Sequence, residues 1–168
     1  VVYKGLGRQF HDLTGHRDLV FEYLKENVVG TQALGSRYDL AIHVRRGDFC
    51  AVGDHGKQNI QTPTAWYRGA WRAAQEALNL EEPNTVLFTD GDPYALRAEL
   101  GLPGVEVDNS RHALLSMMRM ARADLLIGSR STFSLWGCFL GRGDAIWPEQ
   151  FNLGLYKPVD PERDRFVK

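Results

Sequence analysis

Short apolar runs alternate with longer amphipathic stretches along most of this chain. Five runs have the length and composition of buried strands, and they cover residues 38–44, 85–90, 105–108, 123–128 and 142–148. Between them, apolar residues recur at intervals of three or four, which predicts helices over residues 62–80, 93–100, 111–122 and 133–140. Strands that alternate with helices in this way predict an α/β fold with a doubly wound parallel sheet of about five strands.

The two ends of the chain carry less pattern. Residues 1–15 predict an irregular lead-in, and residues 16–29 predict an amphipathic helix that packs on the sheet and stops at Gly30. Residues 150–168 are polar and contain proline, so we interpret them as a tail or a connection. The 168 residues form one predicted domain. Because the sequence starts at Val1 without methionine, we expect a fragment or a processed piece.

The first predicted strand ends in the polar sequence His43-Val44-Arg45-Arg46-Gly47-Asp48. Ligands bind at the carboxyl ends of strands in an open α/β sheet, and arginine matches phosphate oxygens with fixed, paired donors. The two arginines therefore predict an anion site, in which Gly47 permits a turn or a close backbone approach and Asp48 orients an arginine or the turn. Two alternatives stay open, namely a solvated turn and an integrin-type adhesion tripeptide, Arg46-Gly47-Asp48.

A second candidate anion site follows the strand at 123–128. Small hydroxyl residues, among them Ser131, Thr132 and Ser134, stand where the next helix begins. Free backbone N–H groups and the positive end of a helix favour phosphate at such a position, and hydroxyl groups add donors. The alternative is that Ser131 or Thr132 only caps the helix.

Metal binding is not predicted. Asp90 and Asp92 follow the strand at 85–90, but capping of the next helix explains Asp92 without a metal. The two cysteines, Cys50 and Cys138, make neither a disulfide framework nor a metal site.

Charge and motif content exclude several function classes. The net charge of −1 gives no global attraction to nucleic acid. No apolar run reaches membrane-spanning length, and neither a Gly-x-Gly-x-x-Gly motif nor a Walker A loop occurs. Residues 49–63 predict a polar loop in which solvent exposure of His55 and Lys57 is favoured over contact with a ligand.

Two motifs resemble those of the α1,2-fucosyltransferases. The sequence at 43–48 looks like the family's His-x-Arg-Arg-Gly-Asp motif. Residues 124–137 are similar to its apolar strand followed by Asn-Ser-Ser/Thr-Phe-Ser-Trp-Trp, and residues 88–92 loosely resemble its Phe-Ser-Asp-Asp segment. The resemblance covers about residues 16–150 and keeps the family's order of motifs.

The resemblance implies the donor-binding half of a GT-B-like glycosyltransferase, with a Rossmann-like sheet. It implies transfer of fucose from GDP-fucose to a glycan hydroxyl with inversion and without a metal. Arg45 and Arg46 would stabilise the leaving diphosphate as the catalytic residues. The implied donor-binding residues are His43, which binds the nucleotide or braces the loop, together with Gly47, Asp48, Asp90, Asp108, Ser131, Thr132, Phe133 and Ser134. The implied partners are GDP-fucose, a glycan acceptor and a missing N-terminal domain, in the Golgi lumen of a eukaryote or the cytoplasm of a bacterium.

The sequence also departs from the family pattern. Leu135-Trp136 replaces the paired tryptophans, and Arg130 is an addition. Where related enzymes carry an acidic residue for guanine, the helix opens with Arg111 and His112, so Asp108 is the nearest substitute. No catalytic base is visible. The alternatives are therefore a non-catalytic GDP-sugar-binding module, such as an inactive relative, and an adhesion or structural domain.

Overall fold

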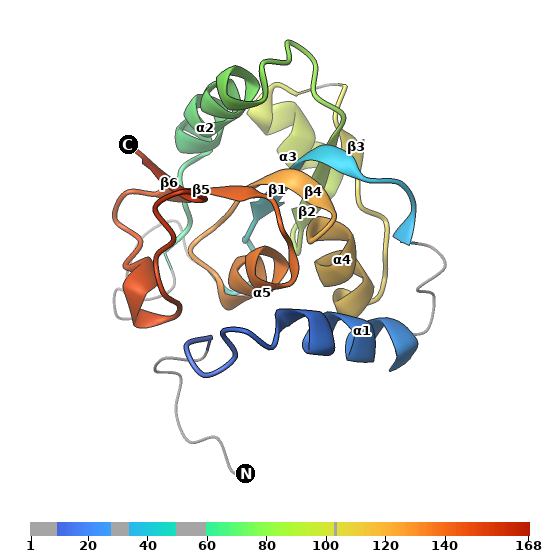
Figure 1. Cartoon of the computed structure of the whole chain (residues 1–168). Coiled ribbons are helices and arrows are strands. Elements are labelled where there is room, and N and C mark those ends of the chain that lie inside the picture. Colours follow the sequence, from blue (N-terminus) through green and yellow to red (C-terminus); the bar gives the residue numbers. More distant parts are fainter. Residues whose placement is uncertain (1–9, 28–33, 50–59, 103) are drawn as a thin grey trace.

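The computed structural model describes residues 10–27, 34–49, 60–102 and 104–168 (Figure 1). Helices and strands alternate along the chain as predicted. In order, the elements are α1 (Arg17–Asn27), β1 (Tyr38–Val44), α2 (Thr64–Leu78), β2 (Thr85–Thr89), α3 (Pro93–Leu100), β3 (Glu106–Val107), α4 (Ala113–Met120), β4 (Ala123–Ile127), α5 (Thr132–Leu140), β5 (Asp144–Pro148), η2 (Leu153–Leu155) and β6 (Asp164–Val167).

The strands form one six-stranded parallel sheet in the order β3-β2-β1-β4-β5-β6. The chain builds outward from β1 to β3 and then crosses to the other side of β1, where β4 begins the second half of the sheet. This Rossmann-like, doubly wound fold confirms the predicted class. The junction between β1 and β4 is its topological switch point, which is where ligands bind in such sheets.

The interpretation of residues 150–168 as a tail or a connection is wrong at its end, because residues 164–167 form β6, and the sheet has six strands rather than about five. β6 pairs in parallel with β5, with Ala145 opposite Asp164. The buried Asp164 carboxylate accepts from Trp147 Nε1 at 2.9 Å and forms an ion pair with Lys157. Asp164 is the buried residue of this edge strand, and it tolerates burial because its carboxylate is partnered, a partnership of which the sequence pattern gave no sign.

Helices cover both faces of the sheet (Figure 1). α2 and α3 lie on one face, where they pack against Leu40, Ile42 and Val44 of β1. α4 and α5 lie on the other face, over Ala41. Because side chains alternate along a strand, His43 points to the same face as Ala41 and therefore toward α5. None of the helices within the described segments is long and apolar enough to cross a membrane.

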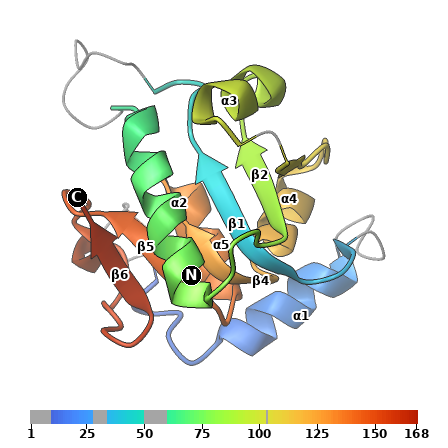
Figure 2. The same cartoon turned by 90° about the horizontal axis from the view of Figure 1, so that it is seen from above.

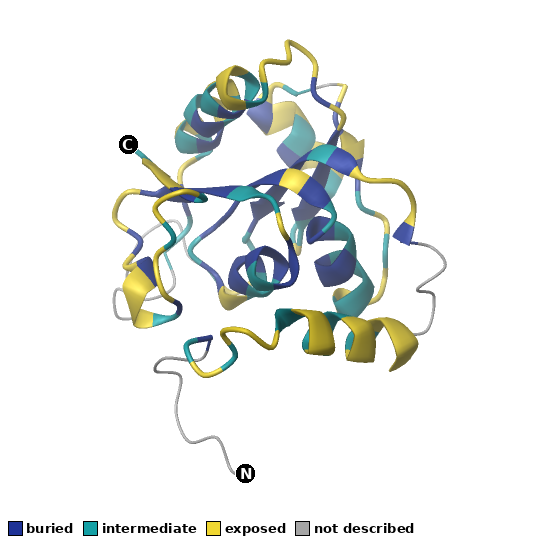
Figure 3. Ribbon diagram, viewed as in Figure 1, coloured by how far each residue is buried: buried dark blue, intermediate teal, exposed yellow. Residues whose placement is uncertain are grey.

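The first helix, α1, does not pack on the sheet as predicted. It lies outside α4 and α5 as a further layer, with Phe21 and Leu24 against Met118 (Figure 1). Figure 3 shows that most of its surface is exposed, whereas the sheet and α5 are largely buried. The spacing of apolar residues correctly predicted a helix with one apolar face. It could not show that this face packs on other helices instead of on the sheet. Residues 10–15 of the expected lead-in form turns, whereas residues 1–9 and the stop at Gly30 lie outside the described residues.

Candidate functional site

The residues of the two sequence motifs meet at one edge of the sheet. The segment from Arg45 to Asp48 follows β1, and the segment from Ser129 to Ser134 follows β4, the strand beside it. Asp90 follows β2, on the other side of β1; β1 and β2 run toward the same edge in Figure 2. We call these three segments together the switch-point edge. The crevice beyond such an edge is the usual ligand position in this fold.

His43 connects the two motifs across the switch point. Its Nδ1 lies 2.6 Å from Ser134 Oγ and 3.0 Å from Ser129 Oγ, although Ser134 is 91 residues away in sequence. Ser134 Oγ also accepts a hydrogen bond from the Ser129 backbone N–H at 2.9 Å. The interaction holds the end of β1 against the start of α5. It agrees with the bracing role that was one of the two expectations for His43.

The environment of His43 keeps its ring uncharged. The residue is only 2% exposed, and the Phe133 ring lies 5.1 Å away between centroids. Burial lowers the pKa of His43 to about 3, and the nearby Arg45 lowers it further, while Asp90 opposes the shift. An imidazole with so low a pKa is a poor general base at neutral pH. The site therefore gains rigidity from His43 rather than proton transfer.

Arg45 is the first of the cations at the switch-point edge, and two carboxylates contact it. Its Nε and Nη2 donate to Asp48 Oδ1 at 3.2 and 2.7 Å, and its Nη1 lies 2.9 Å from Asp90 Oδ2. Of the two contacts expected for Asp48, one with an arginine and one within the turn, the structure shows the contact with an arginine. The guanidinium remains partly exposed while bonded to both carboxylates.

The side chain of Arg46 points away from that of Arg45. Its Nη1 donates to Gln61 Oε1 at 2.8 Å, and its Nη2 donates to Thr64 Oγ1 at 3.0 Å. A third contact, at 3.4 Å, reaches Glu99 of α3. Side chains of neighbouring residues in an extended chain point to opposite sides. Arg45 and Arg46 therefore contact different parts of the domain. The structure does not bring the two guanidinium groups together.

This placement also bears on the adhesion alternative. A recognition tripeptide must offer both its arginine and its aspartate to a partner protein. The Arg46 side chain is 18% exposed and bonded to α2 and α3, whereas Asp48 is bonded to Arg45. The arginine of this tripeptide is thus held by the domain itself, which argues against the adhesion alternative.

Close backbone packing positions Asp90. Its Oδ1 accepts a hydrogen bond from the Arg46 backbone N–H at 2.7 Å. A Cβ atom at Gly47 would lie nearer to the Asp90 carboxylate than van der Waals contact allows. The close approach predicted for Gly47 is therefore confirmed, and only glycine fits there without moving Asp90.

The start of α5 is capped by Ser131, whose Oγ accepts from the Phe133 backbone N–H at 3.1 Å. This confirms the capping alternative for Ser131. Thr132, the first residue of the helix, stays exposed. The start of α5 thus combines a fixed backbone with an exposed hydroxyl at the end of the helix that carries partial positive charge.

Asp108 lies beyond β3 in a different network. Its carboxylate is 3% exposed, accepts from Ser116 Oγ at 2.6 Å and forms an ion pair with Arg119. Both partners belong to α4, so Asp108 fastens that helix to the end of β3. The carboxylate is engaged by the protein rather than presented to a ligand.

Some polar residues around the edge were missed by sequence reasoning. Gln61, Thr64 and Glu99 bind Arg46 but come from helices or their flanks, where polar residues are ordinary surface features. Ser129 carried a signal, because it directly follows a predicted buried strand. Asp92 was correctly interpreted, since it caps α3 through the backbone N–H groups of Tyr94 and Ala95.

Metal-ligating residues do not cluster in the described part of the chain, where no group of three or more His, Cys, Asp or Glu residues is arranged to hold an ion. Cys138 is a free, buried thiol, and burial raises its pKa to about 11. Cys50, His55 and Lys57 lie outside the described residues.

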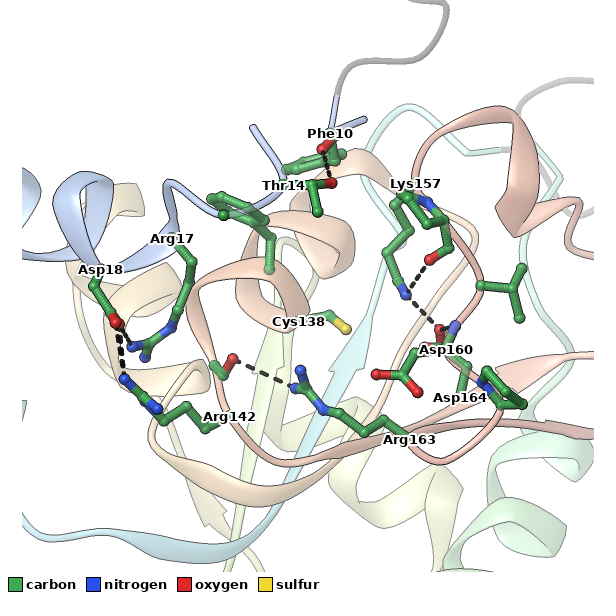
Figure 4. A pocket seen from close by; sticks show the side chains of 16 residues that line it. Phe10, Thr14, Arg17, Asp18, Cys138, Arg142, Lys157, Asp160, Arg163 and Asp164 are labelled. Atoms are coloured by element: carbon green, nitrogen blue, oxygen red, sulfur yellow. Dashed lines mark hydrogen bonds and ion pairs between the residues drawn. The ribbon is translucent and has the colours of Figure 1, made fainter. Parts of the chain in front are cut away.

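A pocket of about 520 Å³ lies elsewhere, near the amino end of β5 (Figure 4). Its charged side chains are already partnered within the protein. Asp18 pairs with both Arg17 and Arg142, and Lys157 pairs with Asp164. Because no residue of the two sequence motifs lines this pocket, we place the candidate site at the switch-point edge, where those motifs meet.

Comparison with known proteins assigns no family. No model of a known protein family matches the chain, and no curated protein matches it. Function is therefore argued from the geometry of the switch-point edge together with the motifs that form it.

Proposed function

We propose that this chain binds the diphosphate of GDP-fucose at the switch-point edge, as the donor-binding part of an inverting, metal-independent fucosyltransferase. The observation that carries the proposal is the hydrogen bonding of His43 to Ser134 and Ser129. It joins the two family-like motifs at the position where this fold binds ligands. Arg45 then stands at the same edge as a partly exposed cation.

The proposed reaction breaks the bond between the sugar's anomeric carbon and the β-phosphate oxygen. GDP leaves with the electron pair, a new bond forms to the acceptor oxygen, and the acceptor's proton passes to a base. Negative charge grows on the β-phosphate in the transition state, and a fixed cation there lowers the barrier. Arg45 supplies that cation, and the start of α5 adds partial positive charge.

The remaining site residues act by positioning. His43 stays neutral and holds β1 against α5, while Asp90 fixes the backbone between Arg45 and Gly47. Arg46 anchors the same turn to α2 and α3. The acceptor site and the base belong, in this proposal, to a preceding domain of the enzyme. Asp108 is left out of the donor contacts because α4 engages its carboxylate.

A second candidate is a GDP-sugar-binding module without turnover. The observation in its favour is that both carboxylates nearest to Arg45 are bonded to it, while burial keeps the His43 ring from acting as a base at neutral pH by lowering its pKa to about 3. Binding of GDP-fucose with no transfer, in the longer protein as well as in this chain, would favour the module over the enzyme.

Calorimetric titration with GDP, GDP-fucose and UDP tests the proposal, with and without EDTA. We expect both guanine nucleotides to bind independently of metal, and UDP not to bind. Arg45→Ala removes a charge-assisted contact, so GDP affinity should fall about tenfold or more. Arg142→Ala is the matched control, because it removes an exposed arginine near the pocket of Figure 4 and should leave GDP affinity unchanged.

Equal GDP affinity in wild type and Arg45→Ala would refute the phosphate role of Arg45. Absence of nucleotide binding, both by this chain and by the longer protein from which we expect it to come, would refute the proposed function altogether.

A further inference from the structure

The guanidinium of Arg45 offers its best anion-binding edge to Asp48. The Nε and Nη2 donors together form the side-on edge that a carboxylate or phosphate engages most favourably. Both donors point at Asp48 Oδ1, at 3.2 and 2.7 Å. The Asp48 carboxylate therefore already occupies the edge of Arg45 that a phosphate would bind.

The two carboxylates on Arg45 are anchored very differently. Asp90 is 28% exposed, and its second oxygen is held by the Arg46 backbone N–H. The side chain of Asp48 is 62% exposed, and within the described residues its hydrogen bonds go to Arg45 alone. Rotation of the Asp48 side chain into solvent therefore breaks only the contact with Arg45, whereas movement of Asp90 would also release the turn after β1.

We propose that Asp48 is an internal competitor for the anion site, one that a ligand phosphate displaces from Arg45 while Asp90 remains in place. The inference rests on the proposed function for the identity of the natural ligand. Asp48 lowers the affinity of every anion by the same factor, because each must first displace it. Only ligands that bind strongly, such as a diphosphate, then occupy the site at moderate concentration.

The size of the effect follows from the exposure of the pair. Exposed ion pairs are weak, so releasing Arg45 from Asp48 should tighten anion binding by only about two- to fivefold. If Asp48 instead served to orient Arg45 for the ligand, its removal would weaken binding. The sign of the change therefore distinguishes the two roles.

The experiment is calorimetric titration of the full chain with inorganic pyrophosphate and, separately, with GDP. Asp48→Ala removes both the charge and the hydrogen bond, while Asp48→Asn removes the charge alone. Asp92→Asn is the matched control, because it removes one negative charge from the segment after β2 and asparagine still caps α3. We expect both Asp48 variants to bind pyrophosphate about two- to fivefold tighter than wild type, and the control to bind like wild type.

Unchanged or weaker binding by both Asp48 variants would overturn the inference, as would an equal gain in Asp92→Asn, which would indicate a general charge effect. The two ligands separate this result from the proposed function. Tighter pyrophosphate binding by the Asp48 variants would support the competitor even if neither this chain nor the longer protein bound GDP, which is the result that refutes the GDP-fucose site. GDP binding that the Asp48 variants do not strengthen would support the site and refute the competitor.

Discussion

The pH dependence of folding provides a direct test of the buried histidine at the switch-point edge. Burial lowers the pKa of His43 to about 3, from 6.5 when the residue is unperturbed. At a pH between these two pKa values, His43 is protonated in the unfolded chain but not in the folded chain. The free energy of unfolding therefore falls as pH decreases below 6.5, and it stops falling on this account near pH 3.

The expected size can be worked from this shift. Each pH unit inside the window changes the free energy of unfolding by about 1.4 kcal/mol. A change from about pH 7.5 to pH 5 covers roughly one and a half pH units of this window. The free energy of unfolding should therefore fall by about 2 kcal/mol because of His43. The result depends little on where the folded pKa of His43 lies, provided that it is below about 4.

Urea unfolding at both pH values measures this loss. His43→Asn removes the titrating ring and keeps a side-chain amide near Ser134. Between the two pH values, the free energy of unfolding of this variant should therefore fall by about 2 kcal/mol less than that of wild type. His112→Asn is the matched control, because the side chain of His112 is exposed at the start of α4, and it should behave like wild type. An equal loss in wild type and His43→Asn would refute a neutral, buried His43.

Two further predictions concern packing around the site and at the last strand. Lys157→Met leaves the buried Asp164 carboxylate without its cation, so the free energy of unfolding should fall by about 3–5 kcal/mol in urea titration. A loss below about 1 kcal/mol would contradict the importance of that pair. Gly47→Ala forces a methyl group against Asp90, and we expect about 1–3 kcal/mol of destabilisation together with weaker pyrophosphate binding. Gly104→Ala, whose new methyl group meets open space, is the control, and an equal effect in both variants would argue against a specific clash at Gly47.

Much of the fold could be predicted because most of its helices and strands follow from the order of apolar and polar residues nearby in the sequence. Apolar runs predicted β1 and β4 to within a residue, and the start signal at Asp92-Pro93 predicted α3 over its full length. Burial of a parallel strand on both faces requires a continuous apolar run, and such a run is visible in the sequence itself. β6 lacks such a run because it is an edge strand with exposed residues, and its buried Asp164 depends on a lysine and a tryptophan outside the strand, so the pattern did not reveal it.

The sequence by itself determined every strand except β6, the class of fold and the polar residues at the strand ends. Only the tertiary structure decided which of these residues meet. The strand order places β4 beside β1, so His43 reaches Ser134, and side-chain alternation sends Arg45 and Arg46 to opposite faces. The physical reason is that secondary structure follows from interactions between near neighbours, whereas a site of this kind consists of contacts between residues that are distant in the chain.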